Sequence, residues 1–275
     1  MNAICFLNNH FLPYRDASLH VSDIGLQRGY GIFDYFLEVD GRIPFLDDYL
    51  DRFYHSAVLL NLEVPLARVL LKEKITFLLQ HNKLGTSGIK LLLTGGYSDD
   101  LYSPSVPNFM IFNLPVFHQP GDFGDGSKLI LLDYRRHIPE VKTTFYLPSI
   151  ALLPKLKEKG AIEVLYHHNG LISETTRANF FLIKNGTLVT PASGVLRGIT
   201  RKYVLEVAKD LMPVEEREVK LEELRESDEA FITGTSKHVA PVVEVEGRFI
   251  GTGRPGMMTK VISEAYERYF KMQIS

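Results

Sequence analysis

The chain has 275 residues, of which 45% are hydrophobic and 23% are charged, and its formal net charge is −2 at pH 7. This length allows two domains or one large α/β unit, and the composition is that of an ordinary globular protein. No uncharged apolar run approaches the roughly 20 residues that a membrane-spanning helix needs. The basic residues are scattered rather than clustered. We therefore expect neither a membrane nor a nucleic acid as a partner.

The single cysteine and the nine histidines limit the redox and metal chemistry of the chain. Cys5 has no second cysteine with which to form an intramolecular disulfide, and the first residues lack the basic region and long apolar core of a secretion signal. We therefore expect a cytoplasmic location. His167 and His168 are adjacent, so in a strand they would point to opposite faces, and no HxxxH pair is present. The sequence thus predicts no metal site.

Residues 1–118 alternate strand-like runs with two helical patterns, which predicts an N-terminal α/β domain. One helix should begin near Asp47 and Asp48, which offer an N-cap, because apolar residues follow at helical spacing. A second helix is predicted from Pro65, a favourable first residue, to about His81. The strand-like runs are residues 4–9, 33–41, 88–96 and 108–117.

Residues 118–128 contain four glycine or proline residues and no apolar periodicity, so we expect a linker at 119–128 and a C-terminal domain at 129–275. In that domain, Asn169-Gly170 and Asn185-Gly186 each lie between strand-like runs. The Asn-Gly dipeptide supplies the positive φ angles of a type I′ turn, so these runs predict an antiparallel meander. Further elements are predicted as a helix over about 199–211, a strand over 229–234 and a hairpin over 242–251.

Two segments carry features of an anion-binding site. A glycine-bearing loop at 194–198 leads into the predicted helix, whose first turn would hold Ile199 and Thr200. A helix N-terminus presents unpaired N–H groups and a positive partial charge, which favours phosphate, although threonine there is also a common cap. In the second segment a predicted strand ends in Thr-Gly-Thr-Ser at 233–236, where hydroxyl and amide groups could hold phosphate oxygens or form an ordinary turn.

Lys142 lies in an apolar and aromatic setting, IPEVKTTFYLP. If this segment is a strand, Lys142 shares a face with Glu140 and Thr144. Burial lowers the pKa of a lysine amine, which Schiff-base chemistry exploits, whereas most lysines lie on the surface. Together with the two anion-binding segments, Lys142 points to a phosphate-bearing carbonyl compound bonded to a lysine, and pyridoxal 5'-phosphate has these groups.

The segment ISETTRANFF, residues 172–181, resembles the (I/V)-(S/T)-E-x-x-x-x-N-(V/I/L/F)-F block of the fold-type IV, or class IV, pyridoxal-phosphate-dependent aminotransferases. That family includes branched-chain aminotransferases, D-amino-acid aminotransferases and aminodeoxychorismate lyases. The resemblance implies that Glu174 pairs with the pyridine nitrogen of the cofactor and that Asn179 is the motif asparagine. An anionic partner keeps that nitrogen protonated, and a protonated ring is the better electron sink.

Further segments are similar to family blocks and follow in the family's order, namely FLDDYLDRFYHSA, VKTTFYLPSIAL, GVLRGITR and TGTSKHVAPV. The resemblance implies that Lys142 forms the Schiff base and moves the proton at the substrate Cα. It also implies that Tyr146 hydrogen-bonds the phenolic oxygen of the cofactor, and that Arg135 is a cation near the lysine or part of a surface ion pair. It places these residues on the phosphate: Arg52, the backbone of Ile199, Thr200, Thr235 and Ser236.

The opening segment LHVSDIGLQRGYGIFDYFLEVDGR also matches the family's glycine block in outline, so the resemblance spans residues 18 to about 245. It implies an α/β (α+β) fold of two domains, with an N-terminal α/β domain, a C-terminal β-rich pseudo-barrel domain and the cofactor between them. It also implies a homodimer in which the partner subunit helps to close the site.

The substrate-binding region departs from the family's subgroups. Residues 33–37 read F-D-Y-F-L where branched-chain enzymes read F-E-G-x-R, and residues 94–96 read T-G-G where D-amino-acid enzymes read T-R-G, so both usual arginines are absent. A substrate carboxylate wants a guanidinium or several hydroxyl and amide donors, and aromatic rings can line an apolar pocket or simply pack in the core. The candidate substrate residues are Arg28, Tyr30, Phe33, Tyr35 and Tyr97.

The activity that the resemblance implies is amino transfer between an amino acid, branched-chain-like in the first place, and a 2-oxo acid, by ping-pong chemistry through Lys142. The nearest alternative keeps the cofactor and is an aminodeoxychorismate lyase that releases 4-aminobenzoate and pyruvate. A more remote alternative is a non-catalytic cofactor-binding protein, which the absent arginines suggest.

Overall fold

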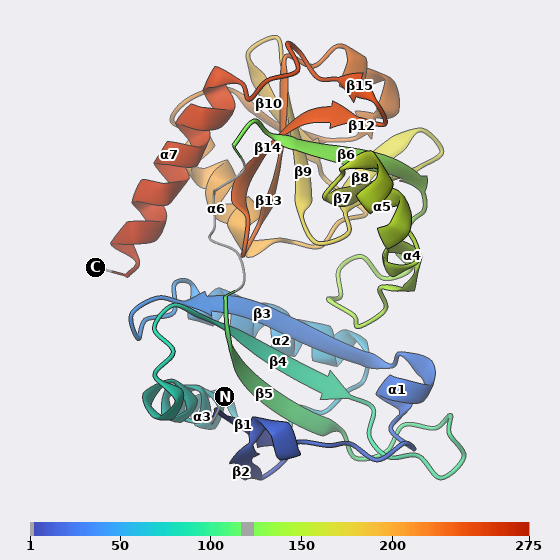
Figure 1. The fold of residues 1–275 in the computed structure, drawn as a ribbon, viewed down its shortest axis with the longest axis vertical. Helices are drawn as coiled ribbons and strands as arrows, with labels where there is room; N and C mark the ends of the chain where they lie inside the picture. Colours follow the sequence, from blue (N-terminus) through green and yellow to red (C-terminus); the bar gives the residue numbers. More distant parts are fainter. Residues whose placement is uncertain (1–2, 117–123, 275) are drawn as a thin grey trace. The chain divides into compact units, whose positions relative to one another are not determined.

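The structure is a computed structural model that describes residues 3–116 and 124–274. The chain forms two compact units, whose elements are labelled in Figure 1. The first comprises Met1–His118 with Val141–Phe145, and the second comprises Gln119–Glu140 with Tyr146–Gln273. The helices of the described residues are each too short or too polar to cross a membrane.

The predicted domain boundary at residue 118 lies outside the described residues and stays a prediction, as does the first half of the predicted linker at 119–128. In the described remainder of that linker, a strand already begins at Ser127. Val141–Phe145 belongs to the first unit, although the sequence assigned it to the C-terminal domain. The reason is backbone pairing, because Thr143 forms a β-bridge with Ile32 of the first unit.

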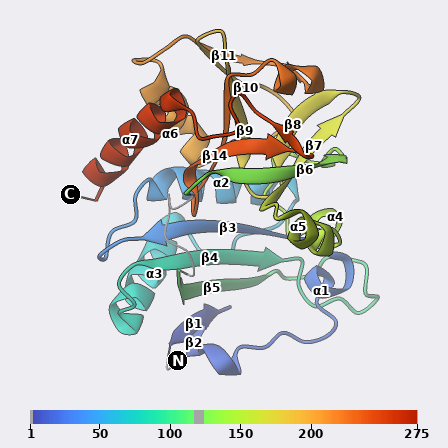
Figure 2. The ribbon, with the colours of Figure 1, turned by 45° about the horizontal axis from the view of Figure 1, so that its top comes forward.

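A five-stranded antiparallel sheet, in the order β2-β1-β5-β4-β3, forms the centre of the first unit (Figure 2). Its strands are β1 (Ile4–Leu7), β2 (His10–Pro13), β3 (Gly31–Glu38), β4 (Ser87–Thr94) and β5 (Asn108–Pro115). The four predicted strands of this half are therefore confirmed. Along β3, Ile32 and Phe36 are fully buried and Phe33 and Tyr35 are half-buried, as expected for a strand whose side chains alternate between two faces.

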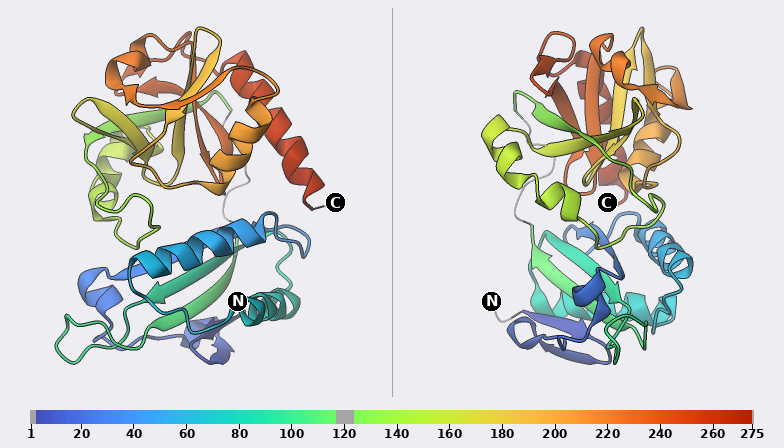
Figure 3. Two further views of the ribbon diagram at one scale, coloured as in Figure 1. Left: turned by 180° about the vertical axis from the view of Figure 1, so that it is seen from behind. Right: turned by 90° about the vertical axis from the view of Figure 1, so that its right-hand side faces the viewer.

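Two helices, α2 (Leu46–Leu59) and α3 (Arg68–Asn82), pack against this sheet, α2 along β3 and α3 along β1 and β5 (Figure 3). The predicted N-cap at Asp47 or Asp48 is wrong, because Phe45 adopts a left-handed conformation and starts the helix earlier. Both aspartates lie in the first turn, where their negative charges interact favourably with the positive end of the helix dipole. Helix α3 begins after the predicted Pro65, because the chain is still extended at Ala67.

The second unit is built on a sheet in the order β11-β10-β9-β13-β14-β6-β7-β8-β12, with β15 paired to β14. A further pairing of β8 with β9 closes β9, β13, β14, β6, β7 and β8 into a ring. Its strands are β6 (Ser127–Asp133), β7 (Glu163–His168), β8 (Leu171–Thr175), β9 (Asn179–Lys184), β10 (Thr187–Pro191), β11 (Val214–Arg217), β12 (Val219–Lys220), β13 (Glu229–Gly234), β14 (His238–Val245) and β15 (Arg248–Phe249). Buried apolar residues of this ring, among them Phe180, Leu182, Ile232 and Val242, form one cluster.

Both Asn-Gly turns are found as predicted. Asn169 and Asn185 have φ angles of 51° and 50°, and the following glycines have φ angles of 75° and 74°. The first turn joins β7 to β8 and the second joins β9 to β10, which gives the expected antiparallel meander. The predicted strand at 229–234 and the hairpin of β14 and β15 are also present.

Helices α6 (Ile199–Ala208) and α7 (Met257–Met272) pack against each other and against β13 and β14, while α4 (Leu147–Ile150) and α5 (Leu153–Lys159) follow β6 (Figure 3). The start of α6 agrees with the predicted helix at 199. Helix α7 was not anticipated from the sequence. Its N-cap residue is Gly256, and the Glu229 carboxylate accepts hydrogen bonds from the amides of Met258 and Thr259 in its first turn.

Candidate active site

Lys142 lies in the segment that runs along the edge of β3. Only Thr143 forms a β-bridge, with Ile32, so the segment is not the strand that the sequence suggested and the alternation with Glu140 does not apply. The amide of Phe33 donates a hydrogen bond to the Lys142 carbonyl at 2.9 Å, and the amide of Thr144 donates one to the Gly31 carbonyl at 3.0 Å. These bonds fix the backbone of Lys142 beside β3.

The ring of Phe33 is flanked by two lysines. The Nζ atom of Lys142 is 4.7 Å from the ring centroid and that of Lys90, on β4, is 4.9 Å from it. Because both distances are measured to the same ring centroid, their sum is an upper limit on the separation of the Lys142 and Lys90 Nζ atoms. Lys90 is half-buried opposite Tyr35, and burial lowers its pKa below the usual value. No carboxylate pairs with Lys90 among the residues that the structure describes.

Lys90 was not anticipated from the sequence. The signal that could have found it is a single charge in the apolar strand run Gly-Ile-Lys-Leu-Leu-Leu-Thr. Strand alternation puts Lys90 and Leu92 on one face of β4. Their cross-strand partners on β3 are Tyr35 and Phe33, so the four side chains lie on the same face of the sheet. A lysine at such a position needs an explanation, because an ammonium group in a half-buried apolar setting is costly unless something compensates its charge.

Arg52, which the resemblance places on the phosphate, is held by a buried aspartate. Its Nε and Nη2 atoms donate hydrogen bonds to the two carboxylate oxygens of Asp34 at 2.9 and 2.7 Å. The side chains of Arg52 and Asp34 are 9% and 0% exposed. A two-pronged contact of this kind fixes the plane of the guanidinium group, so the orientation of Arg52 is determined within the first unit.

The remaining substrate candidates are dispersed over the first unit. The hydroxyl of Tyr30 donates to the carbonyl of Leu60. Arg28 is exposed and donates to the Gln27 carbonyl, and the exposed Tyr97 forms a bridge with Asp23. The structure thus groups Phe33, Tyr35, Lys90 and Lys142, whereas the contacts of Arg28, Tyr30 and Tyr97 described above are with other residues.

In the second unit, Glu174 is a buried carboxylate with donors on both oxygens. Its Oε1 atom accepts from Arg136 Nη1 at 2.7 Å, and its Oε2 atom accepts from the Leu196 amide at 2.9 Å and, at 3.5 Å, from Asn179 Nδ2. Asn179 also donates to the Leu196 carbonyl at 2.8 Å. The cation beside this carboxylate is therefore Arg136, while its neighbour Arg135 is exposed. Charge-assisted hydrogen bonds of this kind favour the ionised carboxylate.

Tyr146 lies in the same electrostatic environment. Burial raises the pKa of its phenol to about 12, the nearby Arg136 opposes that shift, and Glu174 and Glu163 add to it. The phenol is consequently neutral at physiological pH and is able to donate a hydrogen bond.

The loop before α6 is tied to the same cluster. Gly198 precedes the helix, and a Cβ atom at this position would lie 2.1 Å from Asn179 Oδ1, so only glycine fits without displacement. No described side chain caps the helix, whose first turn contains Ile199 and the buried Thr200. These amides and the Thr200 hydroxyl are suited to a phosphate.

Thr235 and Ser236 lie in the turn between β13 and β14, where Gly234 pairs with His238 and the Lys237 amide donates to the Gly234 carbonyl at 3.0 Å. A Cβ atom on Gly234 would be 3.1 Å from the Arg177 carbonyl, so this turn closely approaches the turn that joins Glu174 to Asn179. Thr233, at the end of β13, has a buried hydroxyl with no hydrogen-bond partner among the described residues.

These groups fit pyridoxal 5'-phosphate in kind. Glu174 offers an anion for the ring nitrogen, Tyr146 a neutral phenol, and the start of α6 together with Thr235 and Ser236 offers donors for a phosphate. All of them belong to the second unit, whereas Lys142 and Arg52 belong to the first.

The model of the family described as amino-transferase class IV matches residues 31–245. A protein of Methanocaldococcus jannaschii, provisionally named a branched-chain-amino-acid aminotransferase, is 32% identical over 274 residues, which are 95% of this chain and 94% of that protein. The D-alanine aminotransferase of Listeria monocytogenes serotype 1/2a is 27% identical over 272 residues, which cover 94% of this chain and 93% of that protein.

Among solved structures, the branched-chain amino acid aminotransferase of Escherichia coli has a TM-score of 0.90 to this chain at 26% identity, and the match covers 98% of this chain and 95% of that one. The predicted fold-type IV architecture is confirmed by this similarity. The family match over most of the chain likewise confirms the predicted class of enzyme and its cofactor. The chain belongs to the class IV aminotransferases, which use pyridoxal 5'-phosphate.

Proposed function

We propose that this protein transfers the amino group of an amino acid with an apolar, branched-chain-like side chain to a 2-oxo acid, as a homodimer in the cytoplasm. The observation that carries this proposal is the buried Glu174, whose two oxygens are held by Arg136 and by the loop that leads into α6. The proposal is supported by relatives that are named for branched-chain amino acid and D-alanine aminotransferases.

The cofactor, when bound, supplies the electron sink that stabilises negative charge on the substrate Cα. We assign Lys142 to the covalent bond with the cofactor and to the movement of the proton at the substrate Cα. Glu174 would accept the N–H of the pyridine ring, and Tyr146 would donate to the phenolic oxygen. The residues assigned to the phosphate are Arg52, Ile199, Thr200, Thr235 and Ser236.

For the substrate, we assign Phe33 and Tyr35 to the apolar side chain and Lys90 to the carboxylate. Both arginines of the known subgroups are absent, and Lys90 is a half-buried cation beside Phe33. Arg28, Tyr30 and Tyr97 stay proposals for the same carboxylate, although Tyr30 already donates to a backbone carbonyl within the unit.

The test follows the visible absorption of purified protein to which pyridoxal 5'-phosphate has been added. Pools of L- and D-amino acids are then supplied separately, without any 2-oxo acid. We expect one pool to remove the visible band and to yield a stoichiometric amount of 2-oxo acid, and we expect the Lys142→Ala variant to lack the band from the start. The responsive pool identifies the hand of the substrate.

Two results would contradict amino transfer. A band that no amine changes would support a non-catalytic cofactor-binding protein. Catalytic release of pyruvate from aminodeoxychorismate without an amino acceptor would support a lyase.

A further inference from the structure

Glu163, the first residue of β7, is a buried carboxylate to which the proposed function assigns no contact with cofactor or substrate. Its side chain is 1% exposed, and its Oε1 atom is 2.9 Å from Lys237 Nζ and 2.9 Å from Arg177 Nε. The Lys237 side chain is 11% exposed. One carboxylate oxygen therefore joins two cations that come from different turns of the second unit.

The two turns are those that present the proposed cofactor ligands. Arg177 lies in the turn between Glu174, assigned to the ring nitrogen, and Asn179. Lys237 is the last residue of the turn that contains Thr235 and Ser236, which are assigned to the phosphate. The close approach of Gly234 to the Arg177 carbonyl shows independently that these turns are neighbours.

The residue after Lys237 is also anchored. His238 has a φ angle of 52°, in the left-handed region that only a few per cent of non-glycine residues adopt. Its Nδ1 atom is 2.5 Å from Glu267 Oε1 of α7, and its ring centroid is 4.6 Å from that of Phe270. The turn at 235–237 is thus held on one side by β7, through Lys237, and on the other by α7, through His238.

Stability alone does not account for a buried pair of this kind. The desolvation of two charges offsets most of their attraction, and an apolar pair of the same size is often as stable. What an ion pair adds is a defined distance and direction between the groups that it joins. Here the joined groups are the turn with the phosphate donors and the turn after Glu174.

We propose that Glu163 is a positioning residue, which through Lys237 and Arg177 fixes the phosphate-binding turn at 235–236 relative to the turn that follows Glu174. This inference rests on the proposed function, because it presumes that the second unit binds pyridoxal 5'-phosphate. It assigns to Glu163 and Lys237 no contact with the cofactor. Their effect is exerted through the position of Thr235 and Ser236.

The experiment compares the affinities of the apoprotein for pyridoxal 5'-phosphate and for pyridoxal, which lacks the phosphate, by absorbance titration. We expect Glu163→Gln and Lys237→Met to weaken binding of the phosphorylated form on the order of tenfold, by analogy with the lower end of the loss found when a group that orients a metal ligand is removed. Binding of pyridoxal should change less than about twofold, because Thr235 and Ser236 are assigned to the phosphate, which pyridoxal lacks. Lys237→Arg, which retains the ion pair, should bind as the unmodified protein does.

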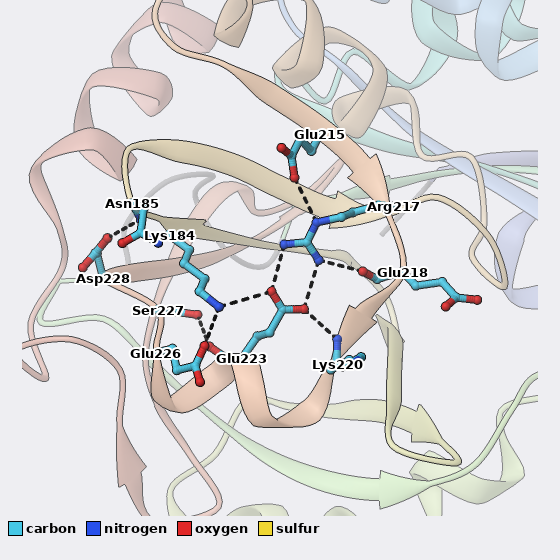
Figure 4. Close-up of polar contacts among 10 residues, drawn as sticks. All are labelled: Lys184, Asn185, Glu215, Arg217, Glu218, Lys220, Glu223, Glu226, Ser227 and Asp228. Carbon is cyan, nitrogen blue, oxygen red and sulfur yellow. Dashed lines mark hydrogen bonds and ion pairs between the residues drawn. The ribbon is translucent and has the colours of Figure 1, made fainter.

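Glu223 provides a matched control in the same unit. This carboxylate also joins two cations, Arg217 at 2.8 Å and Lys184 at 3.6 Å, but it belongs to the polar network shown in Figure 4 and not to the turns described above. Glu223→Gln should leave both affinities unchanged.

Equal affinity of the two variants and the unmodified protein for pyridoxal 5'-phosphate would overturn the inference and leave the proposed function intact. An equal loss for pyridoxal 5'-phosphate and pyridoxal would also overturn it, because general loosening of the unit affects both ligands. If the unmodified protein bound neither ligand, the proposed function itself would fail and the inference with it.

Discussion

Lys90 is a positively charged side chain in a position where burial makes its charge energetically unfavourable. Burial lowers its pKa, and the described residues supply the Phe33 ring but no carboxylate to offset its desolvation. A half-buried cation without a carboxylate partner is typical of a site that binds an anion. Such a site lowers the stability of the free protein, because the charge is compensated only when the anion is bound.

We therefore expect Lys90→Met to raise the KM for the amino donor about tenfold while kcat changes little, since a carboxylate contact is made equally in the ground state and the transition state. The melting temperature of the variant should rise, because a desolvated ammonium group has been removed. Steady-state kinetics and calorimetry check the two effects. Lys74→Met is the matched control, because Lys74 also lies over a ring, that of Phe11 at 5.7 Å. An unchanged KM in Lys90→Met would exclude the carboxylate role.

Tyr146 gives a prediction about pH. Folding raises the pKa of its phenol from 10.0 to about 12, so the folded protein holds this proton more tightly than the unfolded chain does. The stability that this proton contributes is complete below pH 10 and is lost as the pH rises toward 12. The tyrosinate absorbance of the native protein should contain a late step that is missing in Tyr146→Phe. Identical titration curves for the two proteins would show that Tyr146 is not buried as described.

Some of the site could be predicted at this scale and some could not. Glu174 and Asn179 stand in one short motif, and their pairing across the turn of β8 and β9 is a local consequence of that motif. The contact of Arg136 with Glu174 was not predicted, because which side chain turns toward a carboxylate 38 residues away depends on the tertiary path of the chain. The contact of Lys237 with Glu163 joins a turn to a strand that is far away in the sequence, so no local pattern predicts it.

Among the elements, α6 depends most on one small residue at its start. A Cβ atom on Gly198 would lie 2.1 Å from Asn179 Oδ1, and the same asparagine holds the Leu196 carbonyl. We expect Gly198→Ala to lower the free energy of unfolding by about 1–3 kcal/mol, as overpacked substitutions do. It should also weaken pyridoxal 5'-phosphate binding, because the helix start is displaced. Urea denaturation and cofactor titration measure the two effects.

Gly186 separates backbone strain from displacement of the helix. It has a φ angle of 74°, and a Cβ atom there would meet nothing within 4 Å. Gly186→Ala should therefore cost about 1–2 kcal/mol from its left-handed backbone alone and leave cofactor affinity unchanged. If Gly186→Ala impaired cofactor binding as much as Gly198→Ala, the steric account of Gly198 would be wrong.

The elements also show where sequence patterns are reliable. The Asn-Gly turns were predicted because their backbone angles follow from the two residues themselves. The start of α2 was misplaced because Phe45, a residue type that rarely adopts a left-handed conformation, occupies the N-cap position that was expected at Asp47 or Asp48. The segment around Lys142 was taken for a strand, yet its single bridge to Ile32 depends on a neighbour more than a hundred residues earlier in the chain.

For the whole molecule, the family resemblance predicts a homodimer. Light scattering coupled to size-exclusion chromatography should give twice the 31.2 kDa mass of one chain. A monomer that still performs the amino-donor half-reaction would show that a partner subunit is not required to complete the site.

The path of the chain also constrains how the protein is made. Residues 141–145 complete the edge of β3, where the Phe33 amide donates to the Lys142 carbonyl, so the first unit is unfinished when residue 118 leaves the ribosome. Until residue 143 has been synthesised, that edge presents unpaired amides and carbonyls to other nascent chains. The lysine assigned to catalysis thus also belongs to the segment that covers an exposed strand edge during translation. An N-terminal fragment that ends before residue 141 would keep this edge exposed and free to pair with other chains.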